Sequence, residues 1–375
     1  MDRIIFGTPC VDAVSSEVER ANAKRVLVFA SSSLNRGTQA VEELRLALGS
    51  RHVKTIDKFG SFADCKAATV LAADARADFI VAVGGGTIID TAKIVALSIQ
   101  SGFAKRRDEA QLVPDYDADL PLFEIENSPV RIRVVAVPTT LSSTAYSAQT
   151  AWLENSPQLT GPSFQIGRMP DVTVIDPEVT LHTPEKLWFG SGMGAIGQGI
   201  SAILSPEGNP LVDGAALQGI RLTRLGLVEL RRNPQDVDAR RHCLYGAWLA
   251  SFGMHTSMKF SIIHAIAGAL KNNFGIPHHL SSGPLLPALL DHTLSETRDT
   301  QKLIGEQIGT RRMSAATGIS RLLQKLGLPR RLSELGIDRS NLQIIARTTM
   351  TERYPLGQRE KHDASDILKI LDLAA

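Results

Sequence analysis

The sequence contains few cysteines and few aromatic residues. Its three cysteines, Cys10, Cys65 and Cys243, lie far apart in a chain of 375 residues and form no C-x-x-C pair. This distribution excludes a disulfide-built scaffold and a structural zinc knuckle, and it is typical of a reducing compartment, so we expect a cytoplasmic protein. Aromatic residues make up only 5% of the chain, and the tryptophans are too dispersed to form a stacking platform for nucleic-acid bases.

An excess of charge and a long hydrophobic run are also missing. The 41 Lys and Arg residues nearly balance the 39 Asp and Glu residues and are scattered along the chain, so we expect no nucleic-acid or membrane partner. No apolar run reaches the roughly 18 residues of a membrane span, and no basic segment followed by an apolar one opens the chain. With 43% hydrophobic and 21% charged residues, the composition is typical of a globular protein.

Short apolar runs alternate with amphipathic segments in the first half of the chain. The segments 38–50 and 63–77 have apolar residues at helical spacing, whereas the runs around them are typical of strands. The strands that we expect are 25–30, 54–59, 78–83, 133–138 and 171–175. Strands that alternate with helices predict a doubly wound, mostly parallel sheet. The polar stretch 31–37 (SSSLNRG) is expected to be a turn.

The pattern changes near residue 182, inside the LHTPE segment. Beyond it, apolar residues recur at helical spacing with few β-branched clusters. We therefore expect an α/β N-terminal domain over residues 1–182 and an all-helical C-terminal domain over residues 183–375. The charged, proline-bearing segment 104–129 interrupts the α/β alternation, and we expect a loop there, on the surface or over a cleft.

The most informative motif is Gly84-Gly85-Gly86-Thr87, which follows an apolar strand and opens a helix. Adjacent glycines let a ligand approach the backbone without Cβ atoms in the way. The spacing Thr87-x-x-Asp90 matches a capping box, which places the N-terminus of the helix at the glycines. The amides and the positive dipole of that terminus favour a phosphate group. The same residues also fit a tight turn that binds nothing, and they match neither the Walker motif nor G-x-G-x-x-G.

A second motif, residues 138–144 (PTTLSST), places five hydroxyl groups just after a strand. Ligands of open α/β sheets bind at the carboxyl edge of the strands, where hydroxyls would suit ribose and amide groups. The alternative is a hydroxyl-rich turn that satisfies its own backbone.

Four ordered motifs together resemble those of the iron-containing alcohol dehydrogenase family. They are GGGTIIDTAK at 84–93, AVPTT at 136–140, VIDPEVT at 174–180 and HAIAGALKNNFGIPHH at 264–279. The YGAWLA stretch at 245–250 is similar to the maleylacetate reductase branch of that family. The resemblance implies a dehydroquinate synthase-like fold, in which an N-terminal α/β domain binds NAD or NADP and hydride transfer takes place beside a helical domain.

The resemblance also assigns cofactor roles to individual residues. Gly84, Gly85, Gly86 and Thr87 would hold the pyrophosphate, with Asp90 at the start of the helix, and Thr139, Thr140, Ser142 and Ser143 would lie along the nicotinamide. Where the family's aspartate favours NAD, the chain has Ala30 followed by serines, so NADP is admissible and Arg36 would approach its 2′-phosphate. Alternatively, the serines at 31–33 only form a turn.

The metal ligands of the family are partly lost. Its Asp and His, four residues apart on one helix, are replaced by Gly194 and Gln198, while its two later histidines remain as His264 and His278. Two neutral imidazoles without an anionic ligand hold a divalent cation weakly, so we expect no tightly bound metal. A further histidine of the family is replaced by Gly268, and no lysine occurs between residues 108 and 184.

We therefore expect an NAD(P)-dependent oxidoreductase that interconverts an alcohol and a carbonyl, or reduces an activated double bond. His264 or His278 would donate the proton, since the pKa of histidine suits proton transfer near neutrality, although histidines on apolar helices are often core residues. Lys259, Lys271 or His279 would stabilise the alkoxide. Two alternatives stay open: a non-redox lyase or cyclase of the dehydroquinate synthase type, and an inactive nucleotide-binding pseudo-enzyme. The family likeness also implies a homodimer that acts on a small molecule.

Overall fold

The chain folds into two compact units. The computed structural model describes residues 1–100, 131–153, 162–166, 168–206, 208–255, 262–310, 312–351 and 363–375. Unit 1 comprises Met1–Thr140, Thr144–Asn155 and Ser163–His182, and unit 2 comprises Leu141–Ser143, Ser156–Pro162 and Thr183–Ala375. The loop expected at 104–129 and Lys259 lie outside the described residues.

Unit 1 is built on a six-stranded sheet in which all neighbouring strands are parallel. The strands stand in the order β1-β8-β5-β4-β2-β3. Their bounds are Arg3–Phe6 (β1), Val26–Ala30 (β2), His52–Ile56 (β3), Phe79–Gly84 (β4), Arg133–Pro138 (β5) and Val172–Ile175 (β8). A separate two-stranded sheet consists of β6 (Gln149–Leu153) and β7 (Pro162–Ile166).

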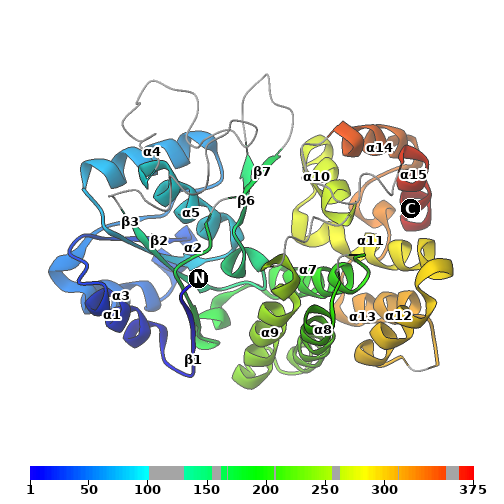
Figure 1. Ribbon diagram of the computed structural model, residues 1–375, viewed down its shortest axis with the longest axis horizontal. Helices are drawn as coiled ribbons and strands as arrows, with labels where there is room; N and C mark the ends of the chain where they lie inside the picture. Colours follow the sequence, from blue (N-terminus) through cyan, green and yellow to red (C-terminus); the bar gives the residue numbers. More distant parts are fainter. Residues whose placement is uncertain are drawn as a thin grey trace. The chain divides into compact units, whose positions relative to one another are not determined.

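Helices cover both faces of this sheet (Figure 1). Alternate residues of β2, β4, β5 and β8, with Val28 and Val81 among them, pack in one core with α1 (Cys10–Arg20) and α3 (Ala40–Leu48). On the other side, α5 (Gly86–Gln100) contacts β4, β5 and α4 (Phe62–Asp74). Strands buried on both faces read as continuous apolar runs, which explains why β4 and β5 are recognisable in the sequence. The expected doubly wound parallel sheet is confirmed.

Two local expectations for unit 1 are wrong. The stretch expected to be a turn contains a short helix, α2 (Ser32–Gly37), because the Ser31 side chain accepts a hydrogen bond from the Leu34 amide and caps it. Leu34 is buried and holds this helix against the core. The strand expected at 54–59 begins earlier, at His52, and ends at Ile56.

Residues 183–375, which make up most of unit 2, contain helices and no strand among the residues described, as the sequence predicts. Its α-helices are α7 (Glu185–Ile203), α8 (Pro210–Leu230), α9 (Val237–Ala250), α10 (Ile262–Phe274), α11 (His278–His292), α12 (Leu294–Ile308), α13 (Ala315–Leu326), α14 (Leu342–Thr351) and α15 (Ala364–Ala374). None of the described helices is both long and apolar enough to cross a membrane.

Glycines allow α8 and α9 to pack backbone against backbone. A Cβ atom on Gly226 would lie 2.4 Å from the Ala239 carbonyl oxygen, and one on Gly219 would lie 2.6 Å from the Ala250 nitrogen. Gly246 belongs to the same contact, since its Cβ would lie 2.6 Å from the Thr223 nitrogen. The YGAWLA stretch therefore serves helix packing at its glycine.

The Gly246→Ala variant is expected to be destabilised by about 2–3 kcal/mol, because the added methyl group meets backbone atoms that cannot rotate away. Gly214→Ala in α8 is the matched control, since no atom of the described residues lies within 4 Å of a Cβ there. In this control the loss of glycine flexibility should stabilise the protein by about 0.5–1 kcal/mol. Chemical denaturation of both variants measures the difference, and equal stabilities would contradict the packing described.

Candidate functional site

The topology of unit 1 points to one place on the sheet for a ligand. Strand β2 pairs with β3 on one side and with β4 on the other, so the connections that leave β2 and β4 diverge. Open α/β sheets bind ligands at the carboxyl ends of the strands at such a switch point. The segment 84–86 ends β4 there, and the segment 31–33 follows β2.

The glycine turn is accessible from solvent. Gly84 is buried, Gly85 and Gly86 are half-buried, and Thr87 is exposed. A Cβ on Gly85 would lie 3.1 Å from Thr140 Cγ2, so a larger side chain there would press on Thr140. The helix α5 begins at Gly86, and the amides of its first turn lack partners within the helix. These features suit an anion.

The capping box expected at this helix is not formed. Because α5 already begins at Gly86, Thr87 lies inside the helix, and its carbonyl accepts a hydrogen bond from Thr91 Oγ1 at 2.8 Å. The Asp90 carboxylate is only 3% exposed, and its Oδ1 lies 3.1 Å from Lys93 Nζ. The helix therefore starts at the predicted place, one residue before Thr87.

The hydroxyl cluster lies next to the glycine turn. Gly84 and Pro138 are in register on β4 and β5, and the Thr139 amide donates a hydrogen bond to the Gly84 carbonyl at 2.9 Å. Thr139 and Thr140 are buried beside the turn. Two motifs about fifty residues apart in the chain thus meet at one edge of the sheet.

The other two hydroxyls of the expected set, Ser142 and Ser143, belong with Leu141 to unit 2. Both serines are half-buried. The Leu141 amide donates a hydrogen bond to Ser191 Oγ on α7 at 3.2 Å. The chain therefore passes from unit 1 into unit 2 and back within the hydroxyl cluster itself.

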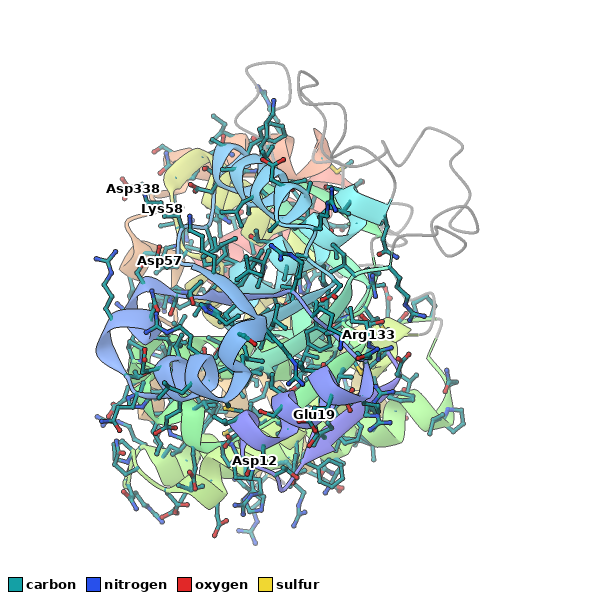
Figure 2. All side chains as sticks on the ribbon, turned by 90° about the vertical axis from the view of Figure 1, so that its left-hand side faces the viewer. Asp12, Glu19, Asp57, Lys58, Arg133 and Asp338 are labelled. Atoms are coloured by element: carbon teal, nitrogen blue, oxygen red, sulfur yellow. The ribbon has the colours of Figure 1, made fainter. Side chains whose placement is uncertain are left out.

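The segment after β2 carries a salt bridge that the sequence does not reveal. Arg36 is 76% exposed at its side chain, and one of its guanidinium nitrogens lies 3.4 Å from Asp57 Oδ2. Asp57 follows β3 and lies beside Lys58 at the surface (Figure 2). A carboxylate from the end of the neighbouring strand thus lies near the segment that follows Ala30.

In unit 2, His264 and His278 come together. His264 lies on α10 and His278 is the first residue of α11, and their ring centroids are 5.7 Å apart. His264 is half-buried and His278 is exposed. The two histidines expected to act together are therefore neighbours, although fourteen residues separate them.

The surroundings of both histidines disfavour the charged imidazolium form. Burial lowers the pKa of His264 to about 3, and the neighbouring His278 lowers it as well. Desolvation also lowers the pKa of His278, followed by the charges of Lys271 and His279, although solvent at its exposed ring screens part of this effect. The expectation of an ordinary histidine pKa near neutrality is wrong for this pair, because the surroundings disfavour the imidazolium ion.

The former metal positions lie on α7. Cβ atoms on Gly190 and Gly197 would meet α11, at 2.6 Å from the His279 carbonyl oxygen and at 3.1 Å from Leu286 Cδ2. Gly194 shares that helix face by its spacing, yet no atom of the described residues lies within 4 Å of a Cβ there. The space beside Gly194 is therefore open among the described residues, at the position where the resemblance places the family's aspartate.

The residues of the described segments do not fit a divalent metal. They contain no group of three or more His, Cys, Asp or Glu side chains placed to hold an ion. Gly194 offers no donor atom, and the amide of Gln198 is a poor ligand for zinc or iron.

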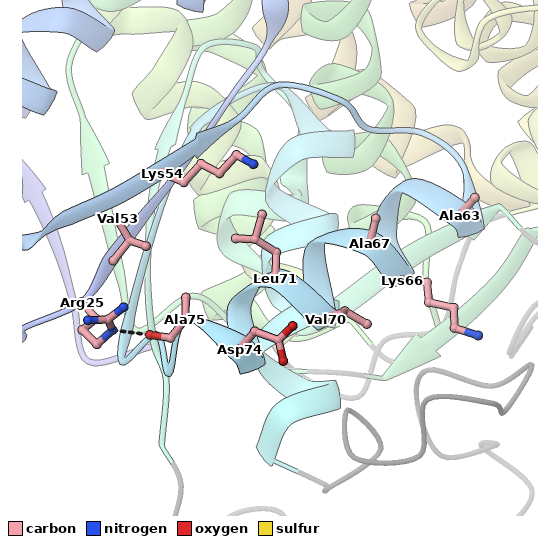
Figure 3. A pocket seen from close by; sticks show the side chains of 10 residues that line it. All are labelled: Arg25, Val53, Lys54, Ala63, Lys66, Ala67, Val70, Leu71, Asp74 and Ala75. Atoms are coloured by element: carbon pink, nitrogen blue, oxygen red, sulfur yellow. Dashed lines mark hydrogen bonds between the residues drawn. The ribbon is translucent and has the colours of Figure 1, made fainter.

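A surface groove of about 860 Å³ runs along α4 (Figure 3). Its lining combines apolar residues of α4 with charged residues around them, and Lys54 projects from β3. None of the residues discussed above for the glycine turn or the histidine pair lines it, so we do not place the active site there.

Comparison with known proteins identifies the family to which the chain belongs. Residues 2–177 match the family described as iron-containing alcohol dehydrogenase, and residues 189–375 match the C-terminal part of the same family. The chain belongs to the iron-containing alcohol dehydrogenase family. It falls in the maleylacetate reductase-like branch, and it is 26% identical to maleylacetate reductase of Burkholderia cepacia over 98% of this chain and 94% of that protein. The resemblance read from the sequence is confirmed, and the protein is an oxidoreductase of this type.

Solved structures show the same fold. Maleylacetate reductase from Rhizobium sp. strain MTP-10005 is 23% identical, with a TM-score of 0.80 over 99% of this chain and 95% of that one. Sulfoacetaldehyde reductase from Bifidobacterium kashiwanohense, solved in complex with NAD+, is 18% identical, with a TM-score of 0.82 over 100% of this chain and 96% of that one.

The low pKa of His264 predicts a pH-dependent stability. An unfolded histidine titrates near 6.5 and folded His264 near 3, so the unfolded chain binds more protons below pH 6.5 and the folded state loses stability as the pH falls. Between pH 7 and pH 5 this residue should cost about 1–2 kcal/mol. Denaturation at both pH values should show a smaller loss for His264→Gln than for the unchanged protein, and an identical loss would contradict the assignment.

Proposed function

We propose that the protein is an NAD(P)-dependent reductase that works without a tightly bound metal. The observation that carries the proposal is the accessible glycine turn at the switch point of the sheet, with Thr140 beside it. Relatives named as reductases and dehydrogenases, one of them solved with NAD+, support the cofactor class.

The residues of unit 1 fit a dinucleotide. Gly85 and Gly86 leave the backbone open to a pyrophosphate, and the first-turn amides of α5 would donate hydrogen bonds to its oxygens. Thr139 and Thr140 would contact the ribose and nicotinamide end, and we propose the same role for Ser142 and Ser143 of the same loop. The cofactor supplies the hydride when bound.

Cofactor choice would depend on Arg36 and Asp57. The Asp57 carboxylate, near the end of β2, would accept hydrogen bonds from a ribose 2′-hydroxyl, whereas Arg36 would pair with a 2′-phosphate. Because the two side chains form a salt bridge of 3.4 Å with each other, either NAD or NADP is admissible at this position.

The histidine pair would act on the carbonyl oxygen of the substrate as neutral imidazoles. A neutral ring nitrogen donates a hydrogen bond that polarises a carbonyl, and it does so without the charge that this environment disfavours. His264 and His278 would therefore orient the substrate and stabilise the developing alkoxide.

The charges near the histidines favour an anionic substrate. Among the described residues, the charges that shift the pKa values of His264, His278 and His279 are all positive, with Lys271 and Lys186 the lysines among them. A substrate carboxylate would be attracted to this region. Maleylacetate, the substrate in the names of several relatives, is a dicarboxylate, so we propose a carboxylated carbonyl or enoate compound as the substrate class.

Titration of NADH and NADPH, followed by nicotinamide fluorescence, tests the cofactor site. The protein should bind at least one of them, and Gly85→Val should weaken binding about 30-fold or more, because the branched side chain would press on Thr140 and displace the turn. Gly37→Ala is the matched control, since no atom of the described residues lies within 4 Å of a Cβ there.

Failure of both dinucleotides to bind would defeat the proposal. Binding with substrate turnover but no net NADH consumption would instead favour the lyase or cyclase type. Binding without any turnover would favour the pseudo-enzyme.

Metal content after chelator treatment tests the second half of the proposal. The purified protein should keep activity without stoichiometric zinc or iron. The double variant Gly194→Asp with Gln198→His should gain stoichiometric metal, because it restores an anionic and an imidazole ligand beside His264 and His278. Gly194→Ala with Gln198→Ala is the control that adds no donor. Stoichiometric metal in the unaltered protein would show that the ligand set has been misjudged.

A further inference from the structure

Lys93, the last residue of the GGGTIIDTAK motif, is fully buried on the helix that follows the glycine turn. The Lys93 side chain on α5 is 0% exposed, and its Nζ lies 3.1 Å from Asp90 Oδ1. The same ammonium group donates hydrogen bonds to the carbonyl oxygens of Thr144, at 3.1 Å, and Ser147, at 3.2 Å. One charged group thus joins the helix after the glycine turn to the segment after the hydroxyl cluster.

Stability alone does not account for this arrangement. Burial lowers the pKa of Lys93, and Asp90 opposes that shift by stabilising the ammonium ion. A buried ion pair is often no more stable than apolar side chains of the same volume. The pair also holds a segment of the chain in place.

The held segment is the short 3-10 helix Ser143–Tyr146 and the residue after it. Lys93 binds the carbonyls of Thr144 and Ser147, and Thr173 Oγ1 on β8 donates a hydrogen bond to the Ala145 carbonyl at 2.7 Å. Three carbonyls in four residues accept hydrogen bonds from buried side chains of the sheet layer. This fixes the chain where it re-enters unit 1, directly after the hydroxyl cluster.

The position of Lys93 along α5 links this contact to the glycine turn. Asp90 and Lys93 share a helix face through their i,i+3 spacing. Lys93 follows Gly86 by seven residues, which is about 10 Å along the helix axis. A single rigid helix therefore carries the open glycine turn at one end and the contact to residues 144–147 two turns later.

We propose that Lys93 is a positioning residue that fastens residues 144–147 to α5 and so keeps Thr139 and Thr140 of the hydroxyl cluster beside the glycine turn. Asp90 acts through Lys93 and does not touch the cofactor. This inference rests on the proposed function, because the hydroxyl cluster matters only if a dinucleotide lies along it. The consequence is that the pair controls cofactor affinity more than folding.

The first test compares Lys93→Met with the double variant Lys93→Met, Asp90→Asn. The single variant leaves Asp90 buried without its cation and should lose thermal stability. The double variant removes both charges and should regain most of that stability. Both should bind NADH about 10-fold or more weakly than the unaltered protein, with the emission of bound nicotinamide shifted towards that of free NADH.

A second pair of variants tests the positioning role without altering a charged residue. Thr173→Val removes the hydrogen bond to the Ala145 carbonyl and should weaken NADH binding in the same direction. Thr69→Val is its matched control, because Thr69 is an equally buried threonine of unit 1 whose hydroxyl bonds the Cys65 carbonyl within α4. Its NADH affinity should match that of the unaltered protein.

A double variant with recovered stability and unchanged NADH affinity would overturn the inference. If the Lys93 variants do not fold, equal NADH affinities of Thr173→Val and Thr69→Val would overturn it instead. Failure of the proposed function can be told apart from failure of this inference, because in that case the unaltered protein itself would bind neither NADH nor NADPH.

Discussion

The close approach of two backbone segments at the carboxyl edge of the sheet sets the geometry of the candidate site. A Cβ atom on Gly85 would lie only 3.1 Å from Thr140 Cγ2. The Thr139 amide donates a hydrogen bond to the Gly84 carbonyl. A Cβ atom at position 85 would press on the Thr140 side chain, which would have to shift by a few tenths of an ångström. The approach of the two segments also leaves the first turn of α5 facing solvent.

Elements with strong local patterns were predictable from the sequence. The strands β4 and β5 are continuous apolar runs because helices cover both faces of the sheet, and α3 and α4 show helical spacing between strands. The segment 31–37 was missed because a single serine cap and one buried leucine outweigh its polar composition. The strand β1 and helix α1 were not predicted either, since β1 has only four residues.

The candidate site was predictable where one motif carries it, and not where distant residues combine. The three adjacent glycines are visible in the sequence as a run. The hydrogen bonds from Lys93 to residues 144 and 147 span more than fifty positions and produce no local sequence pattern. The neutral state of His264 was equally hidden, because it follows from the surroundings of the ring and not from its neighbours in the chain. The salt bridge between Arg36 and Asp57 joins two different strand ends.

The absence of a ligand side chain at Gly194 bears on how sensitive such an enzyme would be to oxygen. A catalyst that holds ferrous iron depends on a supply of the reduced ion and loses activity when the ion is oxidised. Where glycine and glutamine replace the ligands, two imidazoles and nearby lysines would polarise the substrate carbonyl. These side chains are part of the folded chain and need no supply of metal. Under the proposed function, this chain would give up the stronger Lewis acid and would not depend on iron supply.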